Sequence, residues 1–214
     1  MPTLSEAASK ELLGAYGVPF PDERVVTSPD EAVAAAEAIG HPVVVKLGGA
    51  GIAHKTERGL VRLGLGSPGE VRDAARALLD AATEEDGEVH LLVAPMLHAT
   101  RELIAGLHHD PHFGMTVMVG TGGILTELVA DVAFRLVPIG AVDAEEMIDD
   151  LALGALLGPF RGEPAVDRAA LVQVLLGLSR AAEECGDIAS ADVNPLLVVD
   201  GGRPVAVDAL VELR

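Results

Sequence analysis

The order of strands and helices is the feature that most restricts the fold of this chain. Helices and strands alternate at first, but three strand-like runs then follow one another without a helix between them. They occupy 102–107, 114–119 and 133–137. Near the end, the turn residues Asp200 to Gly202 join runs at 190–199 and 204–211, which is a strong hairpin signal. This order predicts an α+β fold in two lobes rather than one doubly wound parallel sheet.

Helix starts are marked by capping boxes, in which a hydroxyl residue stands three positions before a glutamate. The pairs are Thr3 with Glu6, Ser28 with Glu31, and Ser67 with Glu70. We expect helices at 4–16, 29–39, 68–84, 142–156 and 165–184. The remaining predicted strands are 42–47, 59–65 and 89–96. Because the last of these ends through Pro95, we expect a single domain over 1–214 with an N-terminal lobe at 1–92 and a C-terminal lobe at 93–214.

Composition restricts the class of protein. The chain has 214 residues and a formal net charge of -18, which argues against nucleic-acid binding because phosphate contacts need a basic surface. No apolar run is long enough to cross a bilayer, and the first residues lack a secretory signal, so we expect no membrane association and a cytoplasmic location. The single cysteine, Cys185, excludes an internal disulfide framework.

Lys46 is the first candidate site residue. In so acidic a chain, a polyanionic ligand needs a local group of cations or backbone amides. Lys46 ends a buried strand-like run, and Gly48, Gly49 and Gly51 follow it. Glycines let backbone N–H groups approach an anion, although the GxxxxGK[ST] spacing is absent because this lysine precedes its glycines. The alternative is a lysine that extends to the sheet edge without binding anything.

His54 stands at the far end of the same window, directly before Lys55. Cations at Lys55 and Arg58 would lower the pKa of the imidazole and hold a phosphate beside it. A neutral imidazole is a good phosphoryl acceptor. The alternative is a solvated histidine without a role.

A second glycine-rich loop contains Gly120, Gly122 and Gly123, after a strand and before a possible helical turn. Such a loop can bind phosphate or a phosphorylated side chain, while a tight strand-to-helix turn would explain the glycines equally well. The preceding "DPHFG" at 110–114 is a β-turn pattern, so we expect the histidines around it to lie on the turn surface rather than bind metal.

Asp192 and Asn194 alternate along one predicted strand, so their side chains share a face. Counting outward from the Asp200–Gly202 turn brings Asp208 roughly opposite Asn194. A carboxylate and an amide oxygen on facing strands form a hard-oxygen site suited to Mg²⁺, whose other positions are filled by water and phosphate. The alternative is an exposed strand face without a metal.

In this order the motifs resemble a known family. They are Lys46, "HK" at 54–55, "RELIAG" with Glu102, "DPHFG", "GTGG", "ADVNPLLVV" and "AVDAL". The pattern covers about residues 4–212 and resembles the ATP-grasp domain of nucleoside-diphosphate-forming acyl-CoA synthetases, most closely the β subunit of ADP-forming acetyl-CoA synthetase. The resemblance implies an ATP-grasp fold with ATP or ADP between two lobes, Mg²⁺ as cofactor, and phosphate transfer through phosphohistidine.

The resemblance also implies roles for individual residues. Those at the nucleotide would be Lys46 on the α and β phosphates, the backbone of Ala94, Met96 and Leu97 around adenine, and Glu102. Asn194 and Asp208 would be the magnesium ligands. His54, beside Lys55, would relay the phosphate, while Asp192 and the loop with Gly120, Gly122 and Gly123 would orient a phosphohistidine.

Two positions depart from the family pattern. Leu60 replaces a glycine, which would narrow the path beside His54, and Ala94 replaces a polar side chain, so that adenine selection would rest on backbone groups. Since the sequence shows no Rossmann-type CoA fingerprint, the resemblance implies a CoA-binding α subunit or domain as partner and a hetero-oligomer. Two other functions stay open: a nucleotide-sensing regulatory module of a protein acyltransferase, and an ATP-dependent carboxylate–amine ligase without a histidine relay.

Overall fold

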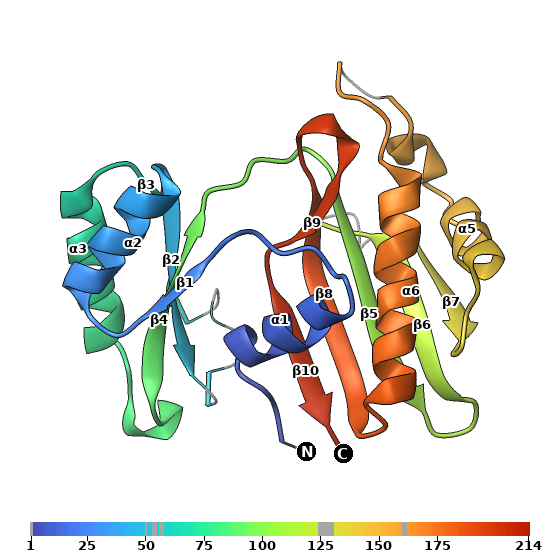
Figure 1. Ribbon diagram of the computed structural model, residues 1–214, viewed down its shortest axis with the longest axis horizontal. Coiled ribbons are helices and arrows are strands. Elements are labelled where there is room, and N and C mark those ends of the chain that lie inside the picture. The colour runs from blue at the N-terminus through green and yellow to red at the C-terminus, as the bar shows by residue number, and fades with distance from the viewer. Residues whose placement is uncertain (1, 50, 53–54, 56–57, 124–130, 160–161) are drawn as a thin grey trace. The chain divides into compact units, whose positions relative to one another are not determined.

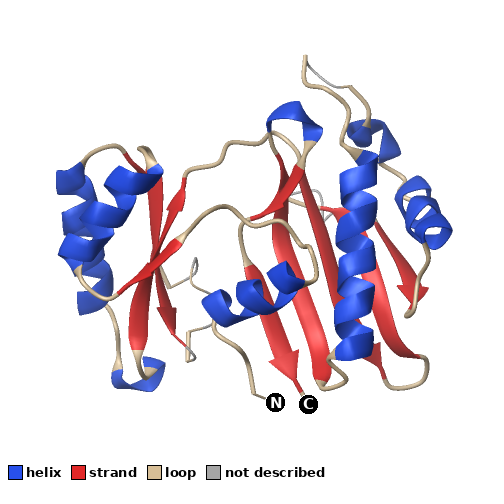
Figure 2. Ribbon diagram, viewed as in Figure 1, coloured by secondary structure: helices blue, strands red, loops and turns tan. Residues whose placement is uncertain are grey.

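The computed structural model describes residues 2–49, 51–52, 55, 58–123, 131–159 and 162–214. The chain forms two compact units. The larger comprises Met1–Leu4, Ala8–Phe20 and His98–Arg214, and the smaller comprises Ser5–Ala7 and Pro21–Leu97. Helices and mainly antiparallel strands occur in both, which confirms the predicted α+β class (Figures 1 and 2). The division into functional lobes at 1–92 and 93–214 stays a prediction.

The smaller unit is a four-stranded antiparallel sheet covered by two helices. Its strands, in sheet order, are β1 (Arg24–Val26), β4 (Val89–Pro95), β2 (Val43–Gly49) and β3 (Val61–Leu65). Helices α2 (Pro29–Ile39) and α3 (Pro68–Asp80) lie side by side against it (Figure 1). Alternate residues of β2, Val43, Val45 and Leu47, join the core beneath these helices. The residues between them therefore face the other way.

Two of the three predicted capping boxes are confirmed. Ser28 and Ser67 each accept a hydrogen bond, 3.3 Å long, from the backbone N–H three residues later, at the starts of α2 and α3. The third box is wrong. Helix α1 (Glu6–Ala15) begins only at Glu6, and Thr3 forms a β-bridge with Glu212 instead. The carboxylate of Glu6 is used elsewhere, as described below.

The larger unit is built on an antiparallel sheet in the order β10-β8-β5-β6-β7, with β9 paired to β8. The strand bounds are β5 (Glu102–Asp110), β6 (Gly114–Thr121), β7 (Val132–Leu136), β8 (Ile188–Val198), β9 (Pro204–Ala206) and β10 (Ala209–Leu213). Helices α5 (Ala141–Asp149) and α6 (Arg168–Glu184) cover one face, and most of α1 packs into the same core (Figure 1). We call the opposite side of this sheet the far face.

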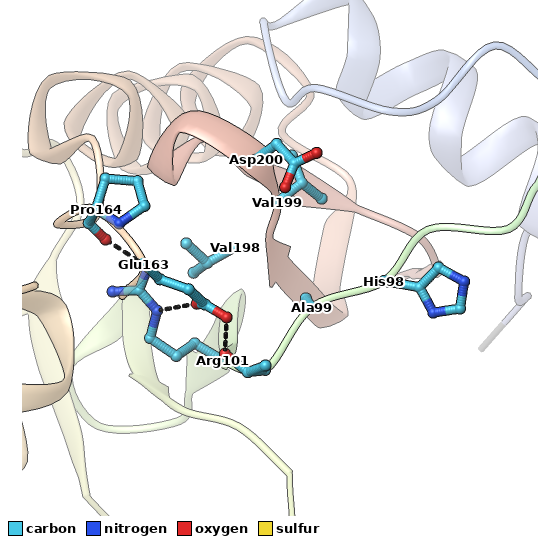
Figure 3. A pocket seen from close by; sticks show the side chains of 9 residues that line it. His98, Ala99, Arg101, Glu163, Pro164, Val198, Val199 and Asp200 are labelled. Atoms are coloured by element: carbon cyan, nitrogen blue, oxygen red, sulfur yellow. Dashed lines mark hydrogen bonds and ion pairs between the residues drawn. The ribbon is translucent and has the colours of Figure 1, made fainter. Parts of the chain in front are cut away.

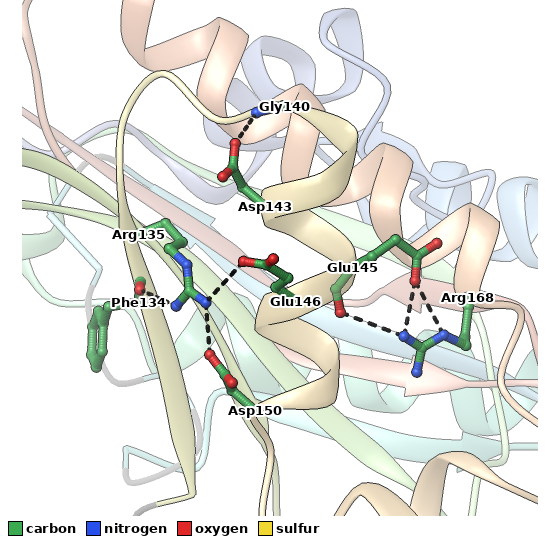
Figure 4. A network of polar contacts seen from close by, with 8 residues as sticks. All are labelled: Phe134, Arg135, Gly140, Asp143, Glu145, Glu146, Asp150 and Arg168. Carbon is green, nitrogen blue, oxygen red and sulfur yellow. Dashed lines mark hydrogen bonds and ion pairs between the residues drawn. The ribbon is translucent and has the colours of Figure 1, made fainter.

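Arginines attach α5 to its neighbours in the larger unit (Figure 4). Arg135 on β7 lies 2.7 Å from the Asp150 carboxylate and 3.8 Å from Glu146. Arg168, at the start of α6, lies 2.9 Å from Glu145. Because these groups are partly exposed, each pair contributes little stability on its own. They orient α5 over a core to which Met147 contributes a fully buried side chain.

A β-bulge in β8 changes which residues face the core. Ala105 of β5 pairs with Val193, whereas Leu103 pairs with Leu196, so β8 carries one extra residue between these pairs. Asn194 and Pro195 occupy the bulge. Residues on either side of it, Val193 and Leu196, are both fully buried.

The terminal hairpin is confirmed, but its second strand is interrupted. The turn is a short 3-10 helix, Asp200–Gly202, in which Gly201 and Gly202 adopt φ values of 79° and 80° that favour glycine. The predicted strand 204–211 divides into β9 and β10 around residues 207 and 208. The short strand β1 was not predicted, and the predicted helix 142–156 ends earlier, as α5, and is followed by a separate 3-10 helix at Gly154–Leu157. Among the described helices, none is both long and apolar enough to span a membrane.

Candidate functional site

Lys46 lies on the side of the smaller sheet that is turned away from α2 and α3, because its neighbours Val45 and Leu47 fill the helix-covered core. The residue is only 9% exposed. Its Nζ lies 2.7 Å from Oε1 of Glu6, at the start of α1. The lysine is therefore held by a carboxylate within the protein and does not extend freely to the sheet edge.

Lys55 reaches the same carboxylate. Its Nζ lies 2.6 Å from the other oxygen of Glu6, Oε2. The side chain of Glu6 is fully buried, and those of Lys46 and Lys55 are 11% and 10% exposed. Two lysines from a strand and from the loop after it thus share one buried carboxylate. His54 lies outside the described residues, so its predicted place beside these cations stays a prediction.

His90 lies on the same face of the smaller sheet. It is paired with Gly48 across β2 and β4, and a Cβ at Gly48 would lie 2.5 Å from its Nε2. Only glycine leaves room for this ring. Burial lowers the pKa of His90, Lys55 lowers it further, and Glu6 opposes the change. Nε2 is buried without a hydrogen-bond partner among the residues described. We call Glu6, Lys46, Lys55 and His90 the lysine cluster.

The other expected cation, Arg58, has a structural role. It forms two hydrogen bonds to Asp86, of 2.6 and 2.9 Å, and Asp86 also accepts hydrogen bonds from Thr83. These bonds, first that from Arg58, hold the pKa of Asp86 far below its usual value. Gly49 and Gly51 belong to the same packing, since a Cβ there would lie 3.0 and 2.6 Å from backbone oxygens at 88 and 85. Close packing of the chain on itself explains these two glycines.

Leu60 does not point toward the lysine cluster. Its side chain is 2% exposed and belongs to the core under α2 and α3. Its backbone donates to Lys55 O (2.8 Å) and accepts from Leu47 N (3.0 Å). Because the side chain fills the helix-covered core, Leu60 is a packing residue; its effect on a path beside His54, which lies outside the described residues, stays a prediction.

The far face of the larger unit carries the predicted oxygen ligands. Asp192 and Asn194 are exposed between core residues of β8. Val193 and Leu196 of β8 pair with Ala209 of β10 and Ala206 of β9, respectively. Asn194 and Asp208 lie between these two pairs, on facing segments of the chain. The surrounding protein partly desolvates the Asp192 carboxylate and so raises its pKa, and the nearby Asp208 carboxylate adds to the rise. Two carboxylates and an amide oxygen are therefore grouped here.

Glu102 and the second glycine-rich loop meet at one edge of this face. The backbone N–H of Gly122 donates to Glu102 O (2.7 Å), and a Cβ at Gly123 would lie 3.3 Å from Glu102 Oε2. Gly123 has a φ of 71°, as a tight turn requires. Gly120, on β6, pairs with Val132 of the neighbouring strand β7, and a Cβ at Gly120 would be 2.5 Å from the Val132 side chain. A tight turn therefore explains the glycines of this loop, and the binding of phosphate or phosphohistidine by the loop stays a prediction.

The segment expected around adenine ends β4. Ala94 is buried and lies on the same side of the sheet as Lys46. The backbone N–H of Met96 already donates to Pro42 O (3.0 Å), so this donor is engaged in the fold. Backbone recognition of a base here would use other groups, such as the Met96 carbonyl or Leu97.

A pocket of about 390 Å³ in the larger unit contains none of the predicted site residues (Figure 3). Its wall includes Arg101, whose side chain is 6% exposed. Arg101 donates to the carbonyls of Leu156, Gly158 and Pro164 and lies 3.3 Å from Glu163. The arginine braces the chain between α5 and α6 against the start of β5.

The structure brings the predicted residues together in two groups, each within its own unit. Lys46 and Lys55 meet at Glu6 in the smaller unit, and Glu102, Asp192, Asn194 and Asp208 lie on the far face of the larger. Sequence reasoning missed Glu6, which looked like a capping residue, and His90, whose signal was a polar residue in the apolar run of β4. Among the described residues, no group of three or more His, Cys, Asp or Glu is arranged around a metal position.

Comparisons with known proteins agree over the whole chain. The model of the ATP-grasp domain family matches residues 2–213. The β subunit of an ADP-forming acetate–CoA ligase II from Pyrococcus furiosus is 38% identical over 214 residues, with 98% of this chain and 91% of the relative covered.

Solved structures of a dinucleotide-forming acetyl-coenzyme A synthetase 1 from Ca. Korarchaeum cryptofilum have the same fold. One, with coenzyme A, Ca-AMPCP and HgCl⁺, has a TM-score of 0.92 at 36% identity and covers 100% of this chain and 94% of that one. Another, with coenzyme A and Mg-AMPPCP and a phosphohistidine segment pointing towards the nucleotide binding site, has a TM-score of 0.84 at 37% identity, with 100% and 93% covered.

Proposed function

Because the chain belongs to the ATP-grasp domain family, with the β subunits of ADP-forming acetate–CoA ligases among its relatives, we propose that it is the nucleotide-binding β subunit of such a ligase. The reaction forms ATP from ADP, phosphate and an acyl-CoA, or runs in reverse. The observation that carries the proposal is the oxygen pair of Asn194 and Asp208 on facing strands, with Asp192 beside it.

This oxygen pair fits Mg²⁺. In nucleotide sites the ion is held by one or two protein oxygens and completes its shell with water and phosphate oxygens, so a pair of ligands is sufficient. Desolvation raises the pKa of Asp192 most, and repulsion from Asp208 adds to the rise; a cation at Asn194 and Asp208 would offset this second contribution. When bound there, Mg²⁺ would neutralise charge on the phosphates of ATP or ADP.

Lys46 and Lys55 are the cations that we assign to the phosphates. Both ammonium groups are held at one point, which suits the neutralisation of charge that develops during phosphoryl transfer. In the direction that consumes ATP, the bond from the γ-phosphorus to its bridging oxygen breaks and ADP leaves with the electron pair. A P–N bond to His54 forms in the same step. We assign Asp192 and the loop with Gly120, Gly122 and Gly123 to the phosphohistidine.

The partner in this proposal is a CoA-binding α subunit, which the β-subunit relatives imply, so we expect a hetero-oligomer. Glu102 and the backbone from Ala94 to Leu97 complete the proposed nucleotide site. A cytoplasmic location is also part of the proposal, supported by the lone cysteine of the chain.

The test is formation of phosphohistidine. The chain is mixed with its α partner and Mg²⁺ with ATP labelled at the γ-phosphate, and acid-labile label on this chain is counted. We expect His54→Ala to abolish the label, while His112→Ala, at a histidine whose side chain is 82% exposed, leaves it unchanged. Asp208→Asn should raise the Mg²⁺ concentration needed for half-maximal labelling by about tenfold. Equal labelling of the His54→Ala chain would overturn the relay, and an active His54→Ala enzyme would instead fit a carboxylate–amine ligase.

A further inference from the structure

We propose that Glu6 is a positioning residue for phosphoryl transfer, which holds Lys46 and Lys55 as a single unit. The inference rests on the proposed function and deepens it, since it concerns the same phosphates. Glu6 contacts both lysines but is assigned no contact with the nucleotide.

The geometry supports a fixed arrangement. The Glu6 side chain is fully buried, and its two oxygens lie 2.7 and 2.6 Å from the two ammonium groups. A buried carboxylate is tolerated only when it is paired, so Glu6 and the lysines stabilise one another in place. The carboxylate comes from the first turn of α1, whereas Lys46 is on β2 and Lys55 is in the loop beyond it. The ion pairs therefore tie three separate segments to one point.

This fixing matters because lysine is a flexible residue. Each side chain carries several rotatable bonds, and a free ammonium group would have to be ordered in each catalytic cycle. With Glu6 in place, that ordering is done by folding, which is the condition for effective charge stabilisation. Lys55 also directly follows His54 in the chain. The bridge through Glu6 thus fixes the residue next to the proposed phosphoryl acceptor relative to β2.

The first measurement uses the complete enzyme with its α partner. Glu6→Gln keeps the shape of the side chain and removes its charge, and Glu11→Gln is the matched control at an exposed glutamate on the same helix. We expect Glu6→Gln to slow phosphohistidine formation about 100-fold, the scale of a small misplacement of reacting groups. The KM for ATP should change by less than about threefold, because the lost interaction acts mainly in the transition state.

A double-mutant cycle with Lys55→Met tests whether Glu6 acts through the lysines. The double variant removes one charge of each sign, so it remains informative if Glu6→Gln alone folds poorly. We expect the double variant to be no slower than Lys55→Met alone. Losses that multiply would overturn the proposal, because Glu6 would then act independently of Lys55.

Lysine acetylation followed by mass spectrometry gives a readout without turnover. The chain has only three lysines, and the acetylation rates of Lys46 and Lys55 are compared with those of the same two residues in the native chain. We expect Glu6→Gln to raise the reactivity of Lys46 and Lys55 together, and Glu11→Gln to leave both unchanged. Unchanged reactivity in Glu6→Gln would refute the inference. If the native enzyme forms no phosphohistidine, the proposed function fails, whereas normal labelling with equal rates for Glu6→Gln and Glu11→Gln refutes only the role of Glu6.

Discussion

Leu60→Ala is expected to destabilise the protein without improving its activity. The side chain of Leu60 is 2% exposed in the core of the smaller unit. Replacement of a buried leucine by alanine costs its transfer free energy plus the cavity that remains, and we expect a loss of about 3 kcal/mol. For a chain of this size, about 2–4 °C of melting temperature is lost per kcal/mol, which gives a fall of about 6–12 °C.

The assay is thermal unfolding followed by circular dichroism, with Leu63→Ala as the control. Leu63 is the same residue type on the neighbouring strand β3 but is 62% exposed, so its replacement should change the free energy of unfolding by less than about 0.5 kcal/mol. The variant carries alanine rather than glycine, because glycine would also make the backbone at position 60 more flexible. Alanine removes the side chain and keeps the backbone hydrogen bonds of Leu60 to Lys55 and Leu47.

Phosphohistidine formation is measured on the same two variants, well below their melting temperatures. Because Leu60 points into the helix-covered core, we expect the rate with Leu60→Ala to stay within about twofold of the native rate. A rate that rises severalfold would mean that the leucine obstructs the phosphate path. A melting temperature equal to that of Leu63→Ala would mean that Leu60 is not buried, and either result refutes the reasoning.

Three further predictions concern charged groups. The lowered pKa of Asp86 means that its pairing with Arg58 stabilises the fold at neutral pH, and that this stability is lost as the pH falls below about 4. In Asp86→Asn, the melting temperature should therefore depend less on pH in this range. The raised pKa of Asp192 means that its charge opposes folding at neutral pH. Asp192→Asn should therefore raise the melting temperature at pH 7, a gain that disappears toward pH 4, while phosphohistidine formation falls. Arg101→Met leaves three carbonyls near α6 without their donor and should cost about 2–4 kcal/mol in urea unfolding; a loss no larger than for exposed arginines would contradict the bracing role.

The parts of the fold that sequence could predict are those set by near neighbours in the chain. Ser28 and Ser67 cap helices because the partner N–H is three residues away, and the turn at Asp200–Gly202 fixes the hairpin because its residues set the backbone. Thr3 and Glu6 show the same local pattern but a different outcome. Glu6 is engaged by two lysines that are distant in sequence, and no local pattern reports such a competitor.

The same difference between local patterns and contacts distant in sequence applies to the candidate site. The grouping of Asn194 with Asp208 followed from counting along a hairpin, where register is set by the turn. The direction of Leu60 could not be obtained in this way. It depends on how Leu60 packs against core residues that are distant in sequence, which a family pattern does not report. The charge of Arg58 predicts a phosphate contact, but its partner in the fold is Asp86, in a 3-10 helix that is distant in sequence.

The bulge in β8 shifts by one residue the positions that face the core, and the sequences of relatives should show this shift as a change in the spacing of apolar residues. From Ser190 to Val198, the core positions have odd numbers before the bulge, at 191 and 193, and even numbers after it, at 196 and 198. Asp192 and Asn194 therefore share the side opposite the core before the bulge, where substitution would change ligand binding without opening a cavity in the core.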